Sequence, residues 1–221
     1  MSAQTAVVLG ATGMIGSQVL ELLLNDDSFS KVRVLVRRPL NIQHPKLETE
    51  VCNFSNFEEF KAKLGNVDCI FCCIGTTNAK VKGDKQLYRT IDFDIPVNAA
   101  RFGKEAGFQQ FLLVSALGAD SSSRIFYSRL KGEVEEVIAT FQYKSFHVFR
   151  PGLLLGNRNE DRPGERFMQL IAKPLSFLFP TNSKPIEGAT VAQAMVNAAK
   201  TNAAGLLYYK FQEMNQLAAV S

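Results

Sequence analysis

The chain has 221 residues, of which 46% are hydrophobic, and its formal net charge at pH 7 is +4. That length suffices for one large core, so we expect residues 1–221 to form a single domain. No apolar run approaches the ~20 residues that cross a bilayer, and the basic residues are dispersed, so neither a membrane span nor a nucleic-acid interface is expected.

Taken in chain order, short apolar runs alternate with segments of helical periodicity. Strands are predicted at residues 5–9, 32–36, 47–51, 67–74, 109–115, 145–150 and 206–210. Helices are predicted at residues 14–25, 56–63, 84–105, 126–142, 163–178 and 188–201. This alternation predicts an α/β fold with one doubly wound parallel sheet.

The first predicted strand runs directly into a turn with three glycines, Gly10, Gly13 and Gly16. In a dinucleotide-binding βαβ unit, the first glycine allows a tight turn, the second lets backbone approach the pyrophosphate, and the third lets the helix pack closely. The N–H groups at the start of the helix then point at the phosphates. An ordinary glycine turn is the alternative. The residues expected to bind a cofactor here are Gly10, Thr12, Gly13, Met14, Ile15 and Gly16.

The second predicted strand ends in two arginines, Arg37 and Arg38. NAD-binding proteins usually have an acidic residue at this place, about 20 residues beyond the glycines, which binds the ribose 2′-hydroxyl. A guanidinium group can instead bind a 2′-phosphate through two hydrogen bonds. The pair therefore predicts NADP(H) rather than NAD, and a solvated basic turn is the alternative.

Two further strand ends carry candidate cofactor contacts. Asn53 follows the third strand, where its amide could hydrogen-bond an adenine. Gly75 and Thr76 follow the fourth strand, and the missing side chain of Gly75 would let backbone lie against the cofactor. Ordinary loop chemistry is the alternative at both places.

The four cysteines are Cys52, Cys69, Cys72 and Cys73. Cys69 and Cys72 have the C-x-x-C spacing of metal and redox sites, but they lie on an apolar strand and no second ligand pair completes a set. We expect buried, reduced, structural thiols and no bound metal. Reduced thiols and the lack of a secretory signal pattern predict a cytoplasmic location.

The candidate catalytic residues are Ser115, Tyr127 and Lys131. Ser115 ends an apolar strand, while Tyr127 and Lys131 are four residues apart and so share one face of a helix. A tyrosine in water has a pKa of about 10, and an ammonium group one turn away lowers that value by stabilising the phenolate. The tyrosine would then donate or accept a proton while the serine hydrogen-bonds the substrate oxygen.

These motifs resemble those of the short-chain dehydrogenase/reductase superfamily, and the resemblance covers nearly the whole chain. The segments that resemble an atypical branch related to the Tat-interacting oxidoreductase are Leu113–Asp120, Lys131–Glu135, Phe149–Gly156 and Arg162–Glu165. The resemblance implies a Rossmann fold, NADP binding and a Ser/Tyr/Lys site. Many members have an asparagine on the helix before the serine that supports a proton relay. Here Asp92 occupies the matching stretch, and Asn98 follows a turn and a half later.

We therefore expect an NADP-dependent oxidoreductase that transfers a hydride between nicotinamide and a small carbonyl or alcohol substrate. An NADPH-sensing protein with a regulatory protein partner and little turnover is the main alternative, and an isomerase or dehydratase of a nucleotide-linked sugar is a third. Residues 151–187 leave a strand end and are expected on the substrate side, with Leu153–Phe179 covering the substrate. The pattern leaves association into a homodimer open.

Overall fold

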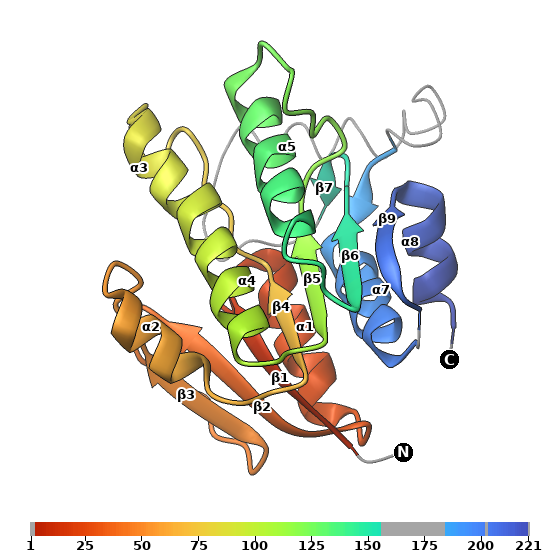
Figure 1. The fold of residues 1–221 in the computed structure, drawn as a ribbon. Helices are drawn as coiled ribbons and strands as arrows, with labels where there is room; N and C mark the ends of the chain where they lie inside the picture. The colour runs from red at the N-terminus through yellow and green to blue at the C-terminus, as the bar shows by residue number, and fades with distance from the viewer. Residues whose placement is uncertain (1–2, 156–183, 202, 221) are drawn as a thin grey trace.

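The computed structural model describes residues 3–155, 184–201 and 203–220 (Figure 1). Its strands are β1 (Gln4–Leu9), β2 (Phe29–Val36), β3 (Leu47–Val51), β4 (Cys69–Cys72), β5 (Gln110–Val114), β6 (Ser145–Phe149), β7 (Leu154–Leu155), β8 (Ile186–Glu187) and β9 (Gly205–Tyr209). Seven of these form one sheet in the order β3-β2-β1-β4-β5-β6-β9, and every neighbouring pair in it is parallel. The predicted doubly wound parallel sheet is therefore confirmed. Strands β7 and β8 form a separate small parallel pair.

Helices cover both faces of the sheet (Figure 1). They are α1 (Met14–Asn25), α2 (Phe57–Leu64), α3 (Lys85–Arg89), η1 (Thr90–Asp94), α4 (Ile95–Glu105), α5 (Phe126–Ala139), α7 (Gly188–Lys200) and α8 (Phe211–Ala218). Helices α1, α7 and α8 pack on one face, in a core that includes Val8 and Phe71. Helices α2, α4 and α5 pack on the other face, in a core that includes Val7 and Ile70. Strand β1 is thus buried on both sides, as a continuous apolar run predicts.

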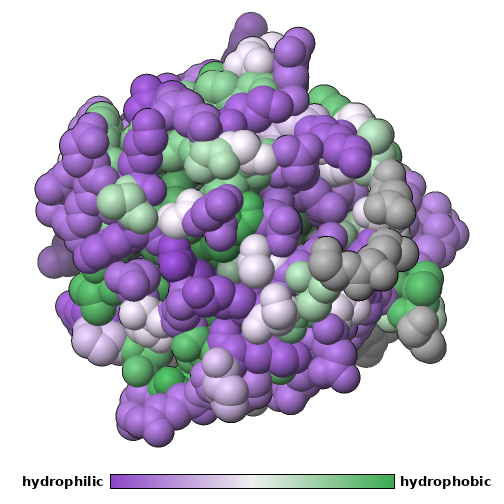
Figure 2. Space-filling model, turned by 60° about the horizontal axis from the view of Figure 1, so that its bottom comes forward, coloured by the Kyte–Doolittle hydropathy of each residue, from purple (hydrophilic) through white to green (hydrophobic). Residues whose placement is uncertain are grey.

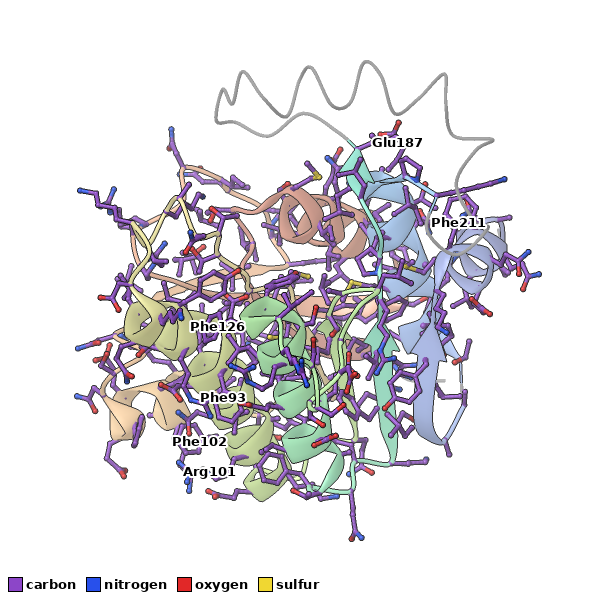
Figure 3. The ribbon with its side chains drawn as sticks, turned by 90° about the horizontal axis from the view of Figure 1, so that it is seen from above. Phe93, Arg101, Phe102, Phe126, Glu187 and Phe211 are labelled. Carbon is purple, nitrogen blue, oxygen red and sulfur yellow. The ribbon has the colours of Figure 1, made fainter. Side chains whose placement is uncertain are left out.

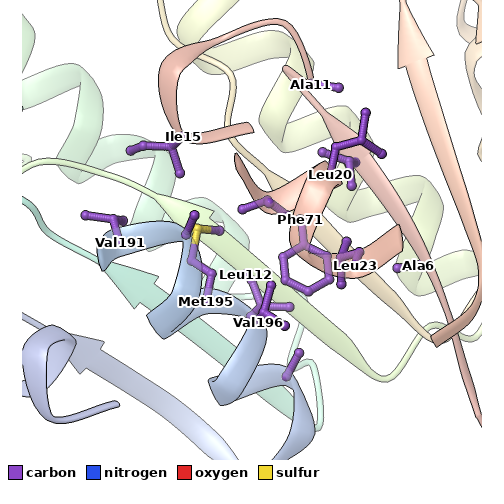
Figure 4. Close-up of a cluster of buried hydrophobic side chains, with 14 of the residues drawn as sticks. Ala6, Ala11, Ile15, Leu20, Leu23, Phe71, Leu112, Val191, Met195 and Val196 are labelled. Carbon is purple, nitrogen blue, oxygen red and sulfur yellow. The ribbon is translucent and has the colours of Figure 1, made fainter. Parts of the chain in front are cut away.

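The packing of α1 on α7 builds the part of the core next to the glycine turn between β1 and α1 (Figure 4). The buried side chains that meet there are Ile15, Leu20 and Leu23 from α1 and Val191, Met195 and Val196 from α7. Their spacing is that of an apolar helix face, so each helix presents one stripe to the other. This contact fixes where α1 begins and therefore where the preceding glycine turn lies.

Some elements differ from the sequence expectation. The single helix predicted at 84–105 is α3, η1 and α4 in succession, with a π-helical turn at Thr90–Asp94. The sequence pattern predicts neither α8 nor the β7–β8 pair. The helix predicted at 163–178 and most of the expected substrate cover, Leu153–Phe179, lie outside the described residues. A single domain over 1–221 stays a prediction.

One face of the molecule is largely polar. Figure 2 shows a face on which hydrophilic side chains dominate and hydrophobic ones are scattered. Apolar residues scattered singly on a surface are normal and need no partner. None of the helices in the described part of the chain is long and apolar enough to cross a membrane.

Candidate functional site

The turn between β1 and α1 requires glycine at two of its three glycine positions. Gly10 has a φ of +81°, and a Cβ atom there would lie 2.6 Å from the carbonyl oxygen of Cys73. A Cβ atom on Gly16 would overlap the carbonyl oxygen of Gly10. Gly13 differs, because a Cβ atom there would meet only the Gly10 oxygen, at 3.3 Å. The first and third glycines therefore shape the turn, and the second leaves its outer surface open.

The start of α1 is suited to an anion. Gly13 is the N-cap, it provides no side-chain cap, and the first turn has no acidic residue. The backbone N–H groups of Met14, Ile15 and Gly16 have no acceptor inside the helix. The Ile15 side chain belongs to the core, so its backbone alone can reach a ligand. Thr12 is exposed beside this helix end.

The other predicted cofactor residues follow strands that are neighbours in the sheet, so their strand ends share one edge with the glycine turn. Arg37 and Arg38 are exposed after β2, and neither has a hydrogen bond or ion pair to another described residue. Asn53 is exposed after β3, but its Oδ1 already accepts from the Ser55 N–H at 3.1 Å. The amide N–H groups of its side chain and one lone pair of Oδ1 are left for a ligand.

A buried carboxylate organises the loop after β4. Asp92 is 1% exposed and lies in the π-helical turn η1. Its Oδ1 accepts from the Thr76 N–H at 2.7 Å, and its Oδ2 lies 2.9 Å from Nζ of Lys131. The Tyr88 hydroxyl donates to the Thr76 carbonyl at 3.1 Å. Asp92 therefore ties the loop that holds Gly75 and Thr76 to helix α5.

The environment of Lys131 keeps it charged. Burial alone would lower the pKa of Lys131, but the Asp92 carboxylate, with smaller contributions from Tyr127 and Cys72, raises it above its usual value. Its Nζ lies 6.0 Å from the centroid of the Tyr127 ring. Tyr127 is 41% exposed, so its phenol is open to a ligand. A fixed positive charge therefore lies beside an accessible phenol.

Of the two residues considered for a proton relay, Asp92 lies beside Lys131. The Asn98 side chain accepts from Arg101 at 3.1 Å, further along α4. Asp92 is therefore the residue of the two that contacts both Thr76 and Lys131.

Ser115 and Tyr127 line one cavity of about 250 Å³. The other residues around it are Ala116, Leu117, Gly118, Pro151, Gly152 and Leu154. Ser115 directly follows β5, and its N–H donates to the Phe149 carbonyl at 2.8 Å, which joins it to β6. Figure 3 views this region from above, with Phe126 at the start of α5 and Phe93 from η1 on the same side of the sheet. The structure thus brings Ser115, Tyr127 and Lys131 together.

A buried ion pair beneath the cavity was not predicted. The Ser115 hydroxyl donates to Oε1 of Glu135, which is 2% exposed on α5. The same carboxylate receives two hydrogen bonds from Nε of Arg150, at 3.1 and 3.2 Å, and one from its Nη2. The pKa of Arg150 is raised above its usual value, chiefly by the hydrogen bond to Glu135. The signal for this pair is a second charged residue, one turn after Lys131, on the buried face of α5.

The cysteines form no disulfide. Cys69 and Cys73 pack in the core on the α1 side of the sheet, whereas Cys52 and Cys72 pack in the core on the α2 side. Burial raises the pKa of Cys72 to about 12, and it also raises the pKa values of Cys69 and Cys73. No group of three His, Cys, Asp or Glu side chains within the described residues could hold a metal ion. Absence of a metal stays a prediction.

The parallel sheet, the glycine turn and the helix end above it together define a Rossmann-type dinucleotide-binding protein. A family model described as NAD(P)H-binding matches residues 10–202. The chain therefore belongs to the NAD(P)H-binding family.

Curated relatives agree with this assignment. Protein HTATIP2 from Rattus norvegicus is 36% identical over 168 residues, which are 75% of this chain and 69% of the rat protein. Protein FMP52-1, mitochondrial, from Scheffersomyces stipitis is 32% identical over 228 residues, which are 96% of this chain and 98% of the yeast protein. The resemblance to the Tat-interacting branch of the short-chain dehydrogenase/reductase superfamily is confirmed.

Solved structures share the fold at low sequence identity. The enzyme WbmH from Bordetella bronchiseptica, in complex with NAD+, gives a TM-score of 0.73 at 17% identity and covers 94% of this chain and 75% of its own. A GalE-like L-threonine dehydrogenase from Cupriavidus necator, in its holo form, gives a TM-score of 0.72 at 13% identity. That match covers 93% of this chain and 77% of the dehydrogenase chain. Such low identities establish the Rossmann fold and nothing finer.

The prediction of a cytoplasmic location is wrong. The relatives from Scheffersomyces stipitis, Debaryomyces hansenii and Eremothecium gossypii, at 31–35% identity, are all named mitochondrial. The prediction failed because reduced, buried thiols are stable in any reducing compartment. They exclude an oxidising environment but do not distinguish one reducing compartment from another.

Proposed function

We propose that this chain is an NADP-dependent oxidoreductase that acts on a carbonyl or alcohol through Ser115, Tyr127 and Lys131. The observation that carries the proposal is the shared cavity of Ser115 and Tyr127, with the charged Lys131 one helical turn below the phenol. An NAD(P)H-binding family and a Rossmann fold supply the class of chemistry. The residue roles, the choice of NADP and the substrate class are the proposal.

The residues present fit a dinucleotide. Gly10 and Gly16 leave no room for a side chain inside the turn, while the surface over Gly13 is open. The uncapped start of α1 would hold the pyrophosphate. Arg37 and Arg38, which have no partner among the described residues, would hold a 2′-phosphate. Asn53, Gly75 and Thr76 would contact the other parts of the dinucleotide.

The chain's own residues move one proton. A bound nicotinamide would supply or take the hydride. In reduction, the Tyr127 phenol donates its proton to the substrate oxygen, and in oxidation the phenolate takes it back. Lys131 stabilises the phenolate because its charge is held in place by Asp92 at 2.9 Å. Ala116, Leu117 and Pro151 give the cavity apolar walls, which suit a small apolar substrate body.

The choice of cofactor is tested by binding. Replacing Arg37 with alanine removes a charged hydrogen-bonding group, which should weaken NADPH binding about tenfold or more and leave NADH binding little changed. Arg101→Ala is the matched control, because it removes one exposed arginine from the C-terminal half of α4. Calorimetry on the three proteins with both cofactors measures this. Equal affinity of the wild type for NADH and NADPH would refute the choice of NADP.

The catalytic role is tested by turnover. A screen of aldehydes, ketones and quinones for NADPH oxidation supplies a substrate. Tyr127→Phe keeps the ring and removes the hydroxyl, so kcat should fall about a hundredfold or more. Tyr208→Phe is the control, since it removes a phenol hydroxyl from β9, outside the cavity. A Tyr127→Phe variant with most of the wild-type rate refutes the role, and tight NADPH binding without turnover favours the sensing alternative.

A further inference from the structure

The proton of the Ser115 hydroxyl is already committed inside the protein. Its Oγ donates to Glu135, whose carboxylate is held by several hydrogen bonds from Arg150. An ionised carboxylate has no proton, so in this pair the serine must be the donor. The ligand-facing side of Ser115 is therefore left with acceptor lone pairs and no hydrogen.

The ion pair between Glu135 and Arg150, which makes Ser115 the hydrogen-bond donor, is held in place at both ends. Glu135 is 2% exposed and lies on α5 one turn beyond Lys131, while Arg150 directly follows β6. The Arg150 guanidinium also stacks 4.5 Å from the Tyr208 ring centroid, and its backbone N–H donates to Tyr209. Both ends of the ion pair are thus tied to secondary structure. Glu135 and Arg150 are positioning residues for the serine.

The two hydroxyl groups of the cavity therefore play opposite parts. Tyr127 has no hydrogen-bond acceptor among the described residues, so its phenol is free to donate into the cavity. Ser115 can only accept there. A ketone oxygen accepts from the phenol but has nothing to donate to the serine. An alcohol hydroxyl can accept from the phenol and donate to the serine at once.

We propose that this cavity selects an alcohol over the ketone of the same skeleton, because Glu135 and Arg150 turn Ser115 into a hydrogen-bond acceptor. The inference takes the cavity as the substrate site, and so rests on the proposed function. It names the form in which the substrate is held most tightly. The apolar walls at Ala116, Leu117 and Pro151 add that its body is apolar.

One substitution should reverse this preference. In Glu135→Gln, the Arg150 guanidinium requires an acceptor and so keeps the amide oxygen. The amide N–H group then faces Ser115 and donates to its Oγ. The serine proton is released toward the cavity, where it can donate to a ketone. The matched control is Glu136→Gln, which removes the same charge from the next residue on α5, where the carboxylate accepts from Ser121 on the exposed surface.

The test measures the binding of cyclohexanol and cyclohexanone to the cofactor-free protein. The readout is the NMR shift of the backbone amides at Ala116, Leu117 and Gly118, which line the cavity. Wild type and Glu136→Gln should bind the alcohol about fivefold more tightly, the usual contribution of one neutral hydrogen bond. Glu135→Gln should prefer the ketone, and Ser115→Ala should show no preference.

Several results would overturn the inference. These are a wild-type preference for the ketone, an unchanged ratio in Glu135→Gln with native circular dichroism, and no saturable shift with either probe. If Glu135→Gln does not fold, Ser115→Ala still tests the inference. It leaves the ion pair between Glu135 and Arg150 intact and must abolish the preference for the alcohol. The binding test uses the cofactor-free protein, so its result does not depend on turnover. A protein that is an active enzyme but binds the ketone more tightly refutes this inference alone. An alcohol preference in a protein without turnover refutes the proposed function alone.

Discussion

The ion pair between Lys131 and Asp92 makes a sharp prediction about stability. The two side chains are 6% and 1% exposed, and their charged atoms are 2.9 Å apart. Removing one partner of a buried pair leaves an uncompensated charge, which costs about 3–5 kcal/mol of unfolding free energy. Lys131→Met and Asp92→Asn should each lose this amount. For a chain of this length, the loss lowers the melting temperature by about 6–20 °C.

The double variant separates this reasoning from simple damage to the fold. Lys131→Met with Asp92→Asn has no buried charge, and the asparagine oxygen can still accept from Thr76. We expect it to be no less stable than either single variant, which gives a coupling energy of at least about 3 kcal/mol. Lys61→Met is the control, since its ion pair with Glu105 is half exposed and exposed ion pairs contribute little to stability.

Urea denaturation of the five proteins, followed by circular dichroism, gives the four free energies of the cycle and the control. A coupling energy below about 0.5 kcal/mol would mean that the two sites act independently. A loss in Lys131→Met no greater than in Lys61→Met would mean that burial does not make the charge costly. Either result refutes the assigned role of Asp92.

Three further predictions concern other parts of the chain. Burial lowers the pKa of His147 to about 4, whereas the same imidazole in the unfolded chain binds a proton near pH 6.5. The free energy of unfolding should therefore be highest above pH 6.5 and fall by about 2 kcal/mol by pH 5. In denaturant titrations, His147→Asn should lose this part of the pH dependence. Gly16→Ala forces a methyl group into the Gly10 carbonyl and should cost about 1–3 kcal/mol, whereas Gly75→Ala, with 3.7 Å to Asp92, should keep its melting temperature and weaken only NADPH binding in calorimetry. Elemental analysis should find no stoichiometric zinc or iron, and a stoichiometric metal would overturn the structural role of the thiols.

Local signals account for the parts of the fold and site that the sequence predicted. Strand β1 and helix α1 are recognisable because burial on both faces requires a continuous apolar run, and close packing at Gly10 and Gly16 excludes side chains. Tyr127 and Lys131 are recognisable because helical spacing alone places them on one face. Each of these inferences needs only neighbours along the chain.

Contacts between distant segments account for what was missed. Asp92 reaches both Thr76 and Lys131 from a π-helical turn, and one extra residue in a helical turn leaves no mark in the sequence pattern. Glu135 meets Arg150 only after α5 and β6 have packed together. Helix α8 is eight residues long and has one fully buried side chain, Met214, which is too little periodicity to detect.

The packing of α1 against α7 has a consequence for the order in which a new chain becomes functional. The glycine turn is synthesised first, but the part of α1 that packs on α7 has no partner until residues 188–200 have been synthesised. The two helices even meet at their first residues, since a Cβ atom on Gly188 would lie 2.9 Å from Cγ of Met14. We therefore expect full dinucleotide affinity only after α7 has packed on α1, and a cofactor that binds at this turn would stabilise chains in which the two helices have joined.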